Sequence, residues 1–179
     1  MDLESSPLAS FIAATAFAAH KHRDQRRKDA KASPYINHPI ALANVLANEA
    51  RVHDVLVLMA ALLHDTIEDT DTTAEELKAH FGSSVAHIVA EVTDDKTLKK
   101  AERKRQQIIH ASGISAQAKL VKLADKICNL RDMNAAPPAD WNLDRKREYF
   151  DWAKQVVDQM RGAHPKLEAL FDAQYARRP

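Results

Sequence analysis

The segment LLHDTIEDTD, residues 62–71, places a histidine and four carboxylates within eight positions, directly after an apolar run. On a helix, His64 and Glu68 are four residues apart, as are Asp65 and Asp69, so their side chains share neighbouring faces. Like charges at this spacing repel, and near a helix C-terminus acids also oppose the helix dipole. A bound cation would convert this repulsion into coordination. The alternative is a solvated acidic helix end followed by a turn.

Two other stretches contain side chains that bind metals. His38 precedes Pro39, and proline keeps its predecessor out of the α region and suits the first turn of a helix. His38 is therefore predicted near a helix cap, with a capping or surface histidine as the alternative. Asp125 is predicted on or beside the apolar stripe of AKLVKLADKICNLRDM. A buried carboxylate there is costly unless it is paired or binds metal, and a salt bridge is the alternative.

These residues together give two imidazoles and two carboxylates, from His38, His64, Asp65 and Asp125. Such a donor set suits a divalent transition metal such as Mn²⁺, Fe²⁺ or Zn²⁺. The sequence therefore predicts a metal centre assembled from three separate segments.

Helices must position these ligands, because no convincing alternating strand pattern is present and each of the three glycines falls where a helical pattern ends. Thr72–Thr73 precede Glu75–Glu76 at capping-box spacing, so a helix should start there and leave the acidic cluster at the end of the preceding one. The predicted helices are 6–26, 39–50, 53–69, 73–81, 84–93, 99–111, 115–133, 143–161 and 165–176.

Length and composition indicate an ordinary globular protein. The 179 residues favour one domain, 1–179, and the formal net charge of +1 gives no sign of nucleic-acid binding by the chain as a whole. The single cysteine, Cys128, excludes an internal disulfide and a cysteine-rich zinc site. No signal peptide or membrane span is predicted, so we expect a cytoplasmic protein without membrane or nucleic-acid partners. The oligomeric state is not predicted.

Several motifs in combination resemble the small alarmone hydrolases, the stand-alone relatives of the hydrolase domain in SpoT and Rel enzymes, and among them the animal Mesh-type group. The similarity covers about residues 8–172 and includes HRDQRRKD, PYINHPI, ALLHDTIEDTDTT, EVTDDKTL, AKLVKLADKICNLRDM and EYFDWA. It implies an all-α HD-domain bundle of roughly eight to ten helices. It also implies hydrolysis of (p)ppGpp at the 3′ diphosphate, giving GDP or GTP plus pyrophosphate, usually with Mn²⁺.

The resemblance assigns roles to individual residues. His38, His64, Asp65 and Asp125 would hold the metal, with other divalent ions as alternatives to Mn²⁺. Glu68 and Asp69 match the family's acidic pair and would orient or deprotonate the attacking water, typically contributing about 10²–10⁴-fold. The expected substrate contacts are Arg27 and Lys28 by family correspondence, Asn129 because it lies one turn after Asp125, and Lys100, Arg145 and Tyr149 as candidates from the basic run 96–105 and from DRKREYFDW. Most of the basic run 96–105 is read as solvated surface, Phe150 and Trp152 are read as core, and His53, His87 and His110 are given no role.

Other functions stay open at this point. The alternative enzymes are an NADPH 2′-phosphatase or another nucleotide phosphohydrolase, since some Mesh-type members also act on the NADPH 2′ phosphate. A metal- or nucleotide-binding module without catalysis, or a nucleic-acid-binding helical domain resting on the basic runs, would be a different class. The chain leaves no room for a nucleotidyltransferase domain of ordinary size beside the hydrolase, so hydrolysis without alarmone synthesis is expected.

Overall fold

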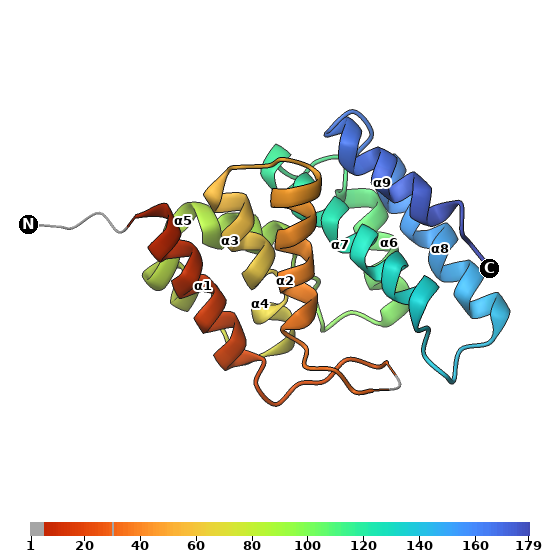
Figure 1. Ribbon diagram of the computed structural model, residues 1–179, viewed down its shortest axis with the longest axis horizontal. Coiled ribbons are helices and arrows are strands. Elements are labelled where there is room, and N and C mark those ends of the chain that lie inside the picture. Colours follow the sequence, from red (N-terminus) through yellow and green to blue (C-terminus); the bar gives the residue numbers. More distant parts are fainter. Residues whose placement is uncertain (1–5, 30) are drawn as a thin grey trace, which may run out of the picture.

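The computed structural model describes residues 6–29 and 31–179, and in this part of the chain every regular element is a helix (Figure 1). The all-α prediction is therefore confirmed. The one isolated β-bridge among these residues joins Arg26 to Pro34. In chain order the elements are α1 (Pro7–Lys21), α2 (Asn37–Asn44), the π-helical η1 (Val45–Glu49), α3 (Val55–Leu63), α4 (Thr66–Asp69), α5 (Ala74–Val92), α6 (Lys100–His110), α7 (Ala116–Ala135), α8 (Leu143–Asp158) and α9 (Pro165–Tyr175).

Two helices, α3 and α7, form the centre of the core. The apolar helix α3 packs against α1, α2, α5 and α7, while α7 also packs against α2, α8 and α9. Figure 1 shows α8 and α9 together on the side of α7 that faces away from α1. The predicted stripe of α7 is buried at Leu123, Ile127 and Leu130. Each fully buried leucine or isoleucine contributes about 1.5–3 kcal/mol, so the core fixes α7 firmly against α3.

The prediction of one long first helix over 6–26 is wrong at its C-terminal end. Helix α1 stops at Lys21, and the chain then forms a two-armed loop before α2. Across this loop the Arg27 N–H donates to the Ser33 carbonyl at 2.8 Å, and the Tyr35 N–H donates to the Gln25 carbonyl at 3.2 Å. Backbone groups that a longer helix would have satisfied internally find partners across the loop instead.

The remaining helices lie close to their predicted ranges. Helix α2 starts two residues earlier than predicted, and its last part becomes the π-helical turn η1. Helix α5 covers both predicted segments, 73–81 and 84–93, and the break between them is real. Gly82 lies at a φ of +85°, a conformation that L side chains rarely adopt, so the helix kinks there. No helix of the described residues is long and apolar enough to cross a membrane.

Candidate active site

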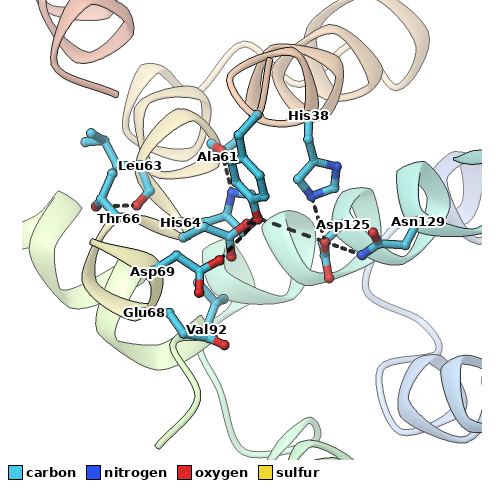
Figure 2. A network of polar contacts seen from close by, with 12 residues as sticks. His38, Ala61, Leu63, His64, Thr66, Glu68, Asp69, Val92, Asp125 and Asn129 are labelled. Carbon is cyan, nitrogen blue, oxygen red and sulfur yellow. Dashed lines mark hydrogen bonds and ion pairs between the residues drawn. The ribbon is translucent and has the colours of Figure 1, made fainter. Parts of the chain in front are cut away.

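The His64–Asp65 pair lies at a break between two helices. Helix α3 ends at Leu63, and the four-residue α4 begins at Thr66. The Thr66 hydroxyl donates to the Leu63 carbonyl at 2.7 Å, and His64 Nδ1 donates to the Ala61 carbonyl at 2.9 Å (Figure 2). These side chains satisfy carbonyls that the end of α3 leaves without helical partners. The prediction of a single helix over 53–69 is therefore wrong, and the acids following Asp65 lie on α4 instead of at the end of α3.

The four predicted metal ligands converge from α2, the α3–α4 break and α7. Ligand atoms of His38, His64 and Asp65 all lie within 4.8 Å of one another. Asp125 Oδ1 lies 3.3 Å from His38 Nε2 and 4.0 Å from His64 Nε2. Both imidazoles are buried, and the Asp65 and Asp125 side chains are 17% and 16% exposed. Three segments distant in sequence thus present their nitrogen and oxygen atoms to one small volume.

The chemistry of this set fits a divalent metal. Because the Ala61 carbonyl can only accept, His64 carries its proton on Nδ1, and a neutral ring then presents the lone pair of Nε2. That nitrogen is buried without a hydrogen-bond partner and lies 2.9 Å from Asp65 Oδ2. Without a metal, burial disfavours the charged ring, but the attraction of Asp65 and Asp125 outweighs it and raises the His64 pKa to about 9. A proton on Nε2 then faces these carboxylates, and a divalent metal is a cation that can take the place of that proton.

The two acids of α4 line the same cavity in different surroundings. Glu68 accepts a hydrogen bond from the Asp94 N–H at 3.1 Å and lies 3.6 Å from Arg103 Nη1. Burial, together with the neighbouring carboxylates, raises the pKa of Glu68 to about 7 against the effect of that hydrogen bond. A carboxyl group with this pKa is suited to proton transfer near neutral pH. Asp69 instead forms an ion pair with Lys96.

Two adjoining cavities meet at this site. The first, of about 270 Å³, is lined by all four predicted metal ligands and by Glu68 and Asp69. The second, of about 680 Å³, extends towards the loop before α2 and the C-terminal end of α7. Arg27, Asn129 and Tyr149 line both cavities, Lys100 lines the first and Lys28 the second. The structure therefore brings five of the six predicted substrate contacts to the cavity walls.

Arg145 is the exception among these six residues. It belongs to the lining of neither cavity. Its guanidinium carbon lies 4.3 Å from the centre of the Trp141 ring, and Nη1 lies 3.7 Å from an Asp140 carboxylate oxygen. Because Trp141 itself lines both cavities, Arg145 lies one side chain away from them.

Comparison with known proteins decides the family. The HD domain family matches residues 14–151 of the chain. The mouse guanosine-3′,5′-bis(diphosphate) 3′-pyrophosphohydrolase MESH1 is 54% identical over 173 residues, with 97% of each chain covered. The fruit fly MESH1, from Drosophila melanogaster, is 49% identical over 96% of each chain. This chain belongs to the MESH1-type HD-domain family. The resemblance to the small alarmone hydrolases is thereby confirmed.

A solved structure supports the same assignment at the level of the fold. It is described as a metazoan ortholog of SpoT that hydrolyses ppGpp, and it matches with a TM-score of 0.92 at 47% sequence identity. The match covers 99% of this chain and 98% of the other. The helical arrangement described above is thus the arrangement of a MESH1-type HD domain.

Sequence reasoning missed a tyrosine that donates a hydrogen bond to Asp65, one of the predicted metal ligands. The Tyr35 hydroxyl donates to Asp65 Oδ2 at 2.5 Å and lies 3.4 Å from Asp69 Oδ2. Burial and the neighbouring Asp65 raise the pKa of Tyr35 well above its ordinary value, so the hydroxyl stays protonated and donates. The ring of buried His22 lies 4.8 Å from the Tyr35 ring. Tyr35 lies in the quoted motif PYINHPI, but its loop has no periodicity that would predict where its side chain points.

Two further predictions about the walls of the first cavity need correction, one for an aromatic residue and one for the basic residues of α6 and α7. Phe150 is buried as predicted, whereas Trp152 packs against the core and lines the first cavity. Further cations line that cavity from α6 and α7, namely Arg103, Lys104, Lys122 and Lys126. Lys122 and Lys126 are four residues apart beside an apolar stripe, a spacing that places both near the buried face of α7. That spacing is the one signal in the sequence that could have identified Lys122 and Lys126 as residues of the site.

Proposed function

We propose that this chain hydrolyses (p)ppGpp at the 3′ diphosphate, giving GDP or GTP and pyrophosphate, and that it uses Mn²⁺ in preference to other divalent metals. The observation that carries the proposal is the buried convergence of His38, His64, Asp65 and Asp125 beside Glu68. The relatives named above as 3′-pyrophosphohydrolases, which are similar over nearly the whole chain, support the choice of substrate.

The metal would be held by the Nε2 atoms of His38 and His64 and by the carboxylates of Asp65 and Asp125. When bound, a divalent cation supplies charge stabilisation for the phosphoryl group and makes a nearby water molecule more acidic. Hydrogen bonds from neighbouring side chains hold the carboxylates of two of these ligands in place. Tyr35 donates to Asp65, and the Asn129 amide donates to Asp125 Oδ1 at 2.6 Å. Such supporting hydrogen bonds orient the ligand oxygens towards the metal.

Glu68 is the residue we assign to proton removal. Ionised Glu68 takes a proton from the attacking water while the water oxygen bonds to the phosphorus next to the ribose 3′ oxygen. The bond from this phosphorus to the 3′ oxygen breaks, the departing 3′ oxygen takes up a proton from solvent, and Glu68 releases the proton it accepted to solvent. Asp69, which the Tyr35 hydroxyl approaches at 3.4 Å, would orient the same water. A positioned base of this kind contributes about 10²–10⁴-fold to the rate.

The second cavity suits the nucleoside part of the substrate. Its volume of about 680 Å³ lies in the range typical of small-molecule sites, and its walls combine Met133, Trp141 and Tyr149 with Arg27 and Lys28. Aromatic and apolar side chains can contact a purine, and the two cations can contact phosphates. Arg145, stacked on Trp141 at the rim, would meet a phosphate that points out of the cavity.

The experiment is a time course of purified protein with Mn²⁺ and ppGpp, followed by ion-exchange chromatography of the products. We expect GDP and pyrophosphate in equal amounts, and no turnover after chelation until Mn²⁺ is restored. Parallel reactions use pppGpp and NADPH, with Mg²⁺, Zn²⁺ and Fe²⁺ tested in place of Mn²⁺. Intact ppGpp beside rapid NADPH dephosphorylation would contradict the proposed substrate, and full activity of a metal-free sample would contradict the mechanism.

A further inference from the structure

One wall of the first cavity consists of lysines from two helices. Lys104 comes from α6, and Lys122 and Lys126 come from α7, one turn apart. Lys122 and Lys126 are buried, at 7% and 3% exposure. The Nζ atoms of Lys104 and Lys126 lie 4.7 and 4.5 Å from the centre of the Trp152 ring. We call these three residues the lysine cluster.

In the part of the chain that the structure describes, two of the three lysines in the cluster have no carboxylate partner at contact distance, and burial lowers the pKa of one of them, Lys122. Within the described residues, no carboxylate oxygen lies within 4.0 Å of the Nζ atoms of Lys104 or Lys122. Lys122 donates to the neutral Val92 carbonyl at 3.1 Å. Lys126 is paired with Asp125 at 3.0 Å, but Asp125 is also a proposed metal ligand. Buried cations without a full counter-charge are costly, so the cluster is suited to an anion.

The electrostatics of Lys104 point the same way. Burial and the positive charges of Lys100 and Lys126 lower the pKa of Lys104. Like charges have therefore been brought together at a cavity wall, where a bound anion would relieve their repulsion. None of the three lysines lines the second cavity, which we assign to the nucleoside. The anion would therefore be bound beside the metal ligands and on a different wall from the nucleoside.

We infer that the lysine cluster binds the distal phosphate of a 3′ diphosphate whose proximal phosphorus lies at the metal ligands. This inference rests on the proposed function and adds a subsite to it. In the reaction, water bonds to the proximal phosphorus and the bond to the ribose 3′ oxygen breaks, so the distal phosphate stays within the pyrophosphate product. The lysine cluster therefore binds the distal phosphate, a part of the substrate that does not react.

This placement has a consequence for specificity. Binding energy from a non-reacting group can position the reacting phosphorus. A substrate that lacks this group loses that binding energy and should react more slowly. A nucleotide with a single 3′ or 2′ phosphate would reach the metal ligands but leave the lysine cluster unfilled. The lysine cluster thus selects diphosphate esters over monophosphate esters.

The first test measures binding of inorganic pyrophosphate and of orthophosphate to the metal-loaded protein by isothermal titration calorimetry. Lys104→Met and Lys122→Met remove one charge each and keep an unbranched apolar side chain. Lys119→Met is the matched control, because Lys119 lies on the same helix as Lys122 and outside the lining of both cavities. Metal content is measured after each titration, so that metal stripped by pyrophosphate is not mistaken for lost affinity.

We expect pyrophosphate to bind the parent more tightly than orthophosphate. Each cluster variant should weaken pyrophosphate binding by about tenfold, as expected for one charge-assisted contact, with a much smaller effect on orthophosphate. The Lys119→Met protein should match the parent. Pyrophosphate affinities of Lys104→Met and Lys122→Met equal to that of the parent would overturn the inference.

The second test compares kcat/KM for ppGpp with that for guanosine 5′-diphosphate 3′-monophosphate. The parent's preference for ppGpp should shrink about tenfold in each cluster variant, because activity on the monophosphate should change little. Equal losses on both substrates would overturn the subsite. The two proposals fail separately: pyrophosphate binding that depends on the cluster, without ppGpp turnover, would contradict the proposed function alone. Turnover of ppGpp with pyrophosphate binding unaffected by the variants would contradict the subsite alone.

Discussion

Two walls of the first cavity each bring like charges together. The acidic wall is formed by Asp65, Glu68 and Asp69, and the lysine wall by the lysine cluster. The two walls differ in the partners that neutralise these charges. On the acidic wall each carboxylate has a donor within the protein. Asp65 accepts from the Tyr35 hydroxyl, Glu68 from the Asp94 N–H, and Asp69 pairs with Lys96. On the lysine wall, Lys104 contacts aromatic rings and Lys122 contacts a neutral carbonyl.

This difference separates the parts of the site that are prepared in advance from the part that is completed by substrate. Donors that are already in place hold the acids of α4 and Asp65 in one geometry, so only a metal is needed to complete them. The lysine cluster gains its counter-charge when a phosphate arrives. Changes on the acidic wall should therefore abolish or slow chemistry, whereas changes on the lysine wall should alter affinity and substrate choice.

The largest effect is expected at Asp65. Asp65→Asn keeps the shape of the side chain but removes the charge that faces His64 Nε2 at 2.9 Å. Metal content and ppGpp turnover should both fall to background, measured by elemental analysis and by product release. Glu75→Gln, at an exposed carboxylate in the first turn of α5, is the control and should retain both. An Asp65→Asn protein that keeps its metal and its activity would show that the acidic wall does not form the metal site.

Glu68→Gln should separate chemistry from metal retention. The amide keeps the size of the side chain and cannot accept the proton of the attacking water. We expect kcat to fall by about 10² or more while metal content stays near that of the parent. Loss of metal together with activity would instead make Glu68 a ligand.

Tyr35→Phe tests the support behind the ligands. The substitution removes one hydroxyl that donates to Asp65 and leaves the ring beside His22 in place. Removal of such a supporting partner typically costs about 10–100-fold in metal affinity or activity. Metal titration and kcat on ppGpp should both show the loss, and the defect in activity should shrink at high Mn²⁺ concentration. Unchanged metal affinity would mean that the hydroxyl does not orient Asp65.

The pH dependence should report Glu68. The proposed base is ionised Glu68, whose pKa is raised to about 7, so log(kcat/KM) should rise with unit slope below about pH 7 and level off above it. The raised pKa also means that Glu68 stabilises the metal-free fold below about pH 4.5 and that this stabilisation is lost as pH rises from there to about 7. Thermal unfolding of metal-free Glu68→Gln should lack this loss. An unchanged rate profile in Glu68→Gln would assign the titration to another group.

The smallest effects distinguish the two arginines predicted to contact substrate. Arg27 lines both cavities and pairs with Asp132, whereas Arg145 lines neither. Arg27→Met should raise KM for ppGpp by about tenfold with kcat less affected, as for a lost charge-assisted contact. Arg145→Met should change KM by less than Arg27→Met does. A larger KM effect at Arg145 would place the outer phosphates at the Trp141 rim.

The sequence predicted the parts of this molecule that are governed by periodicity. The ranges of α7 to α9 follow from apolar spacing, and the buried side of α7 placed Asp125 correctly. The salt bridge offered as the alternative for Asp125 is also present, through Lys126. Oδ2 of Asp125 pairs with Lys126, and Oδ1 lies 3.3 Å from His38 Nε2. The salt bridge therefore leaves one oxygen facing the other predicted ligands, and metal binding by Asp125 stays a prediction.

The features that the sequence did not predict depend on side-chain contacts that leave the periodicity unchanged. The break at His64 rests on hydrogen bonds from Thr66 and from the imidazole, while apolar residues continue in helical register on either side. The loop after Lys21 depends on pairing between its own two arms. Trp152 was placed in the core because spacing identifies the inward face of α8 but not whether that face meets protein or a cavity.

The most direct test of the central claim is hydrolysis of ppGpp in water labelled with heavy oxygen (¹⁸O), by the Mn²⁺-loaded protein, with mass spectrometry of both products. Attack at the proximal phosphorus, with cleavage of its bond to the ribose 3′ oxygen, predicts label in the pyrophosphate and none in the GDP. Label in GDP would show attack at the ribose carbon. Labelled orthophosphate in place of pyrophosphate would show that water attacks the distal phosphorus, and it would contradict the arrangement of metal ligands, Glu68 and lysine cluster proposed above.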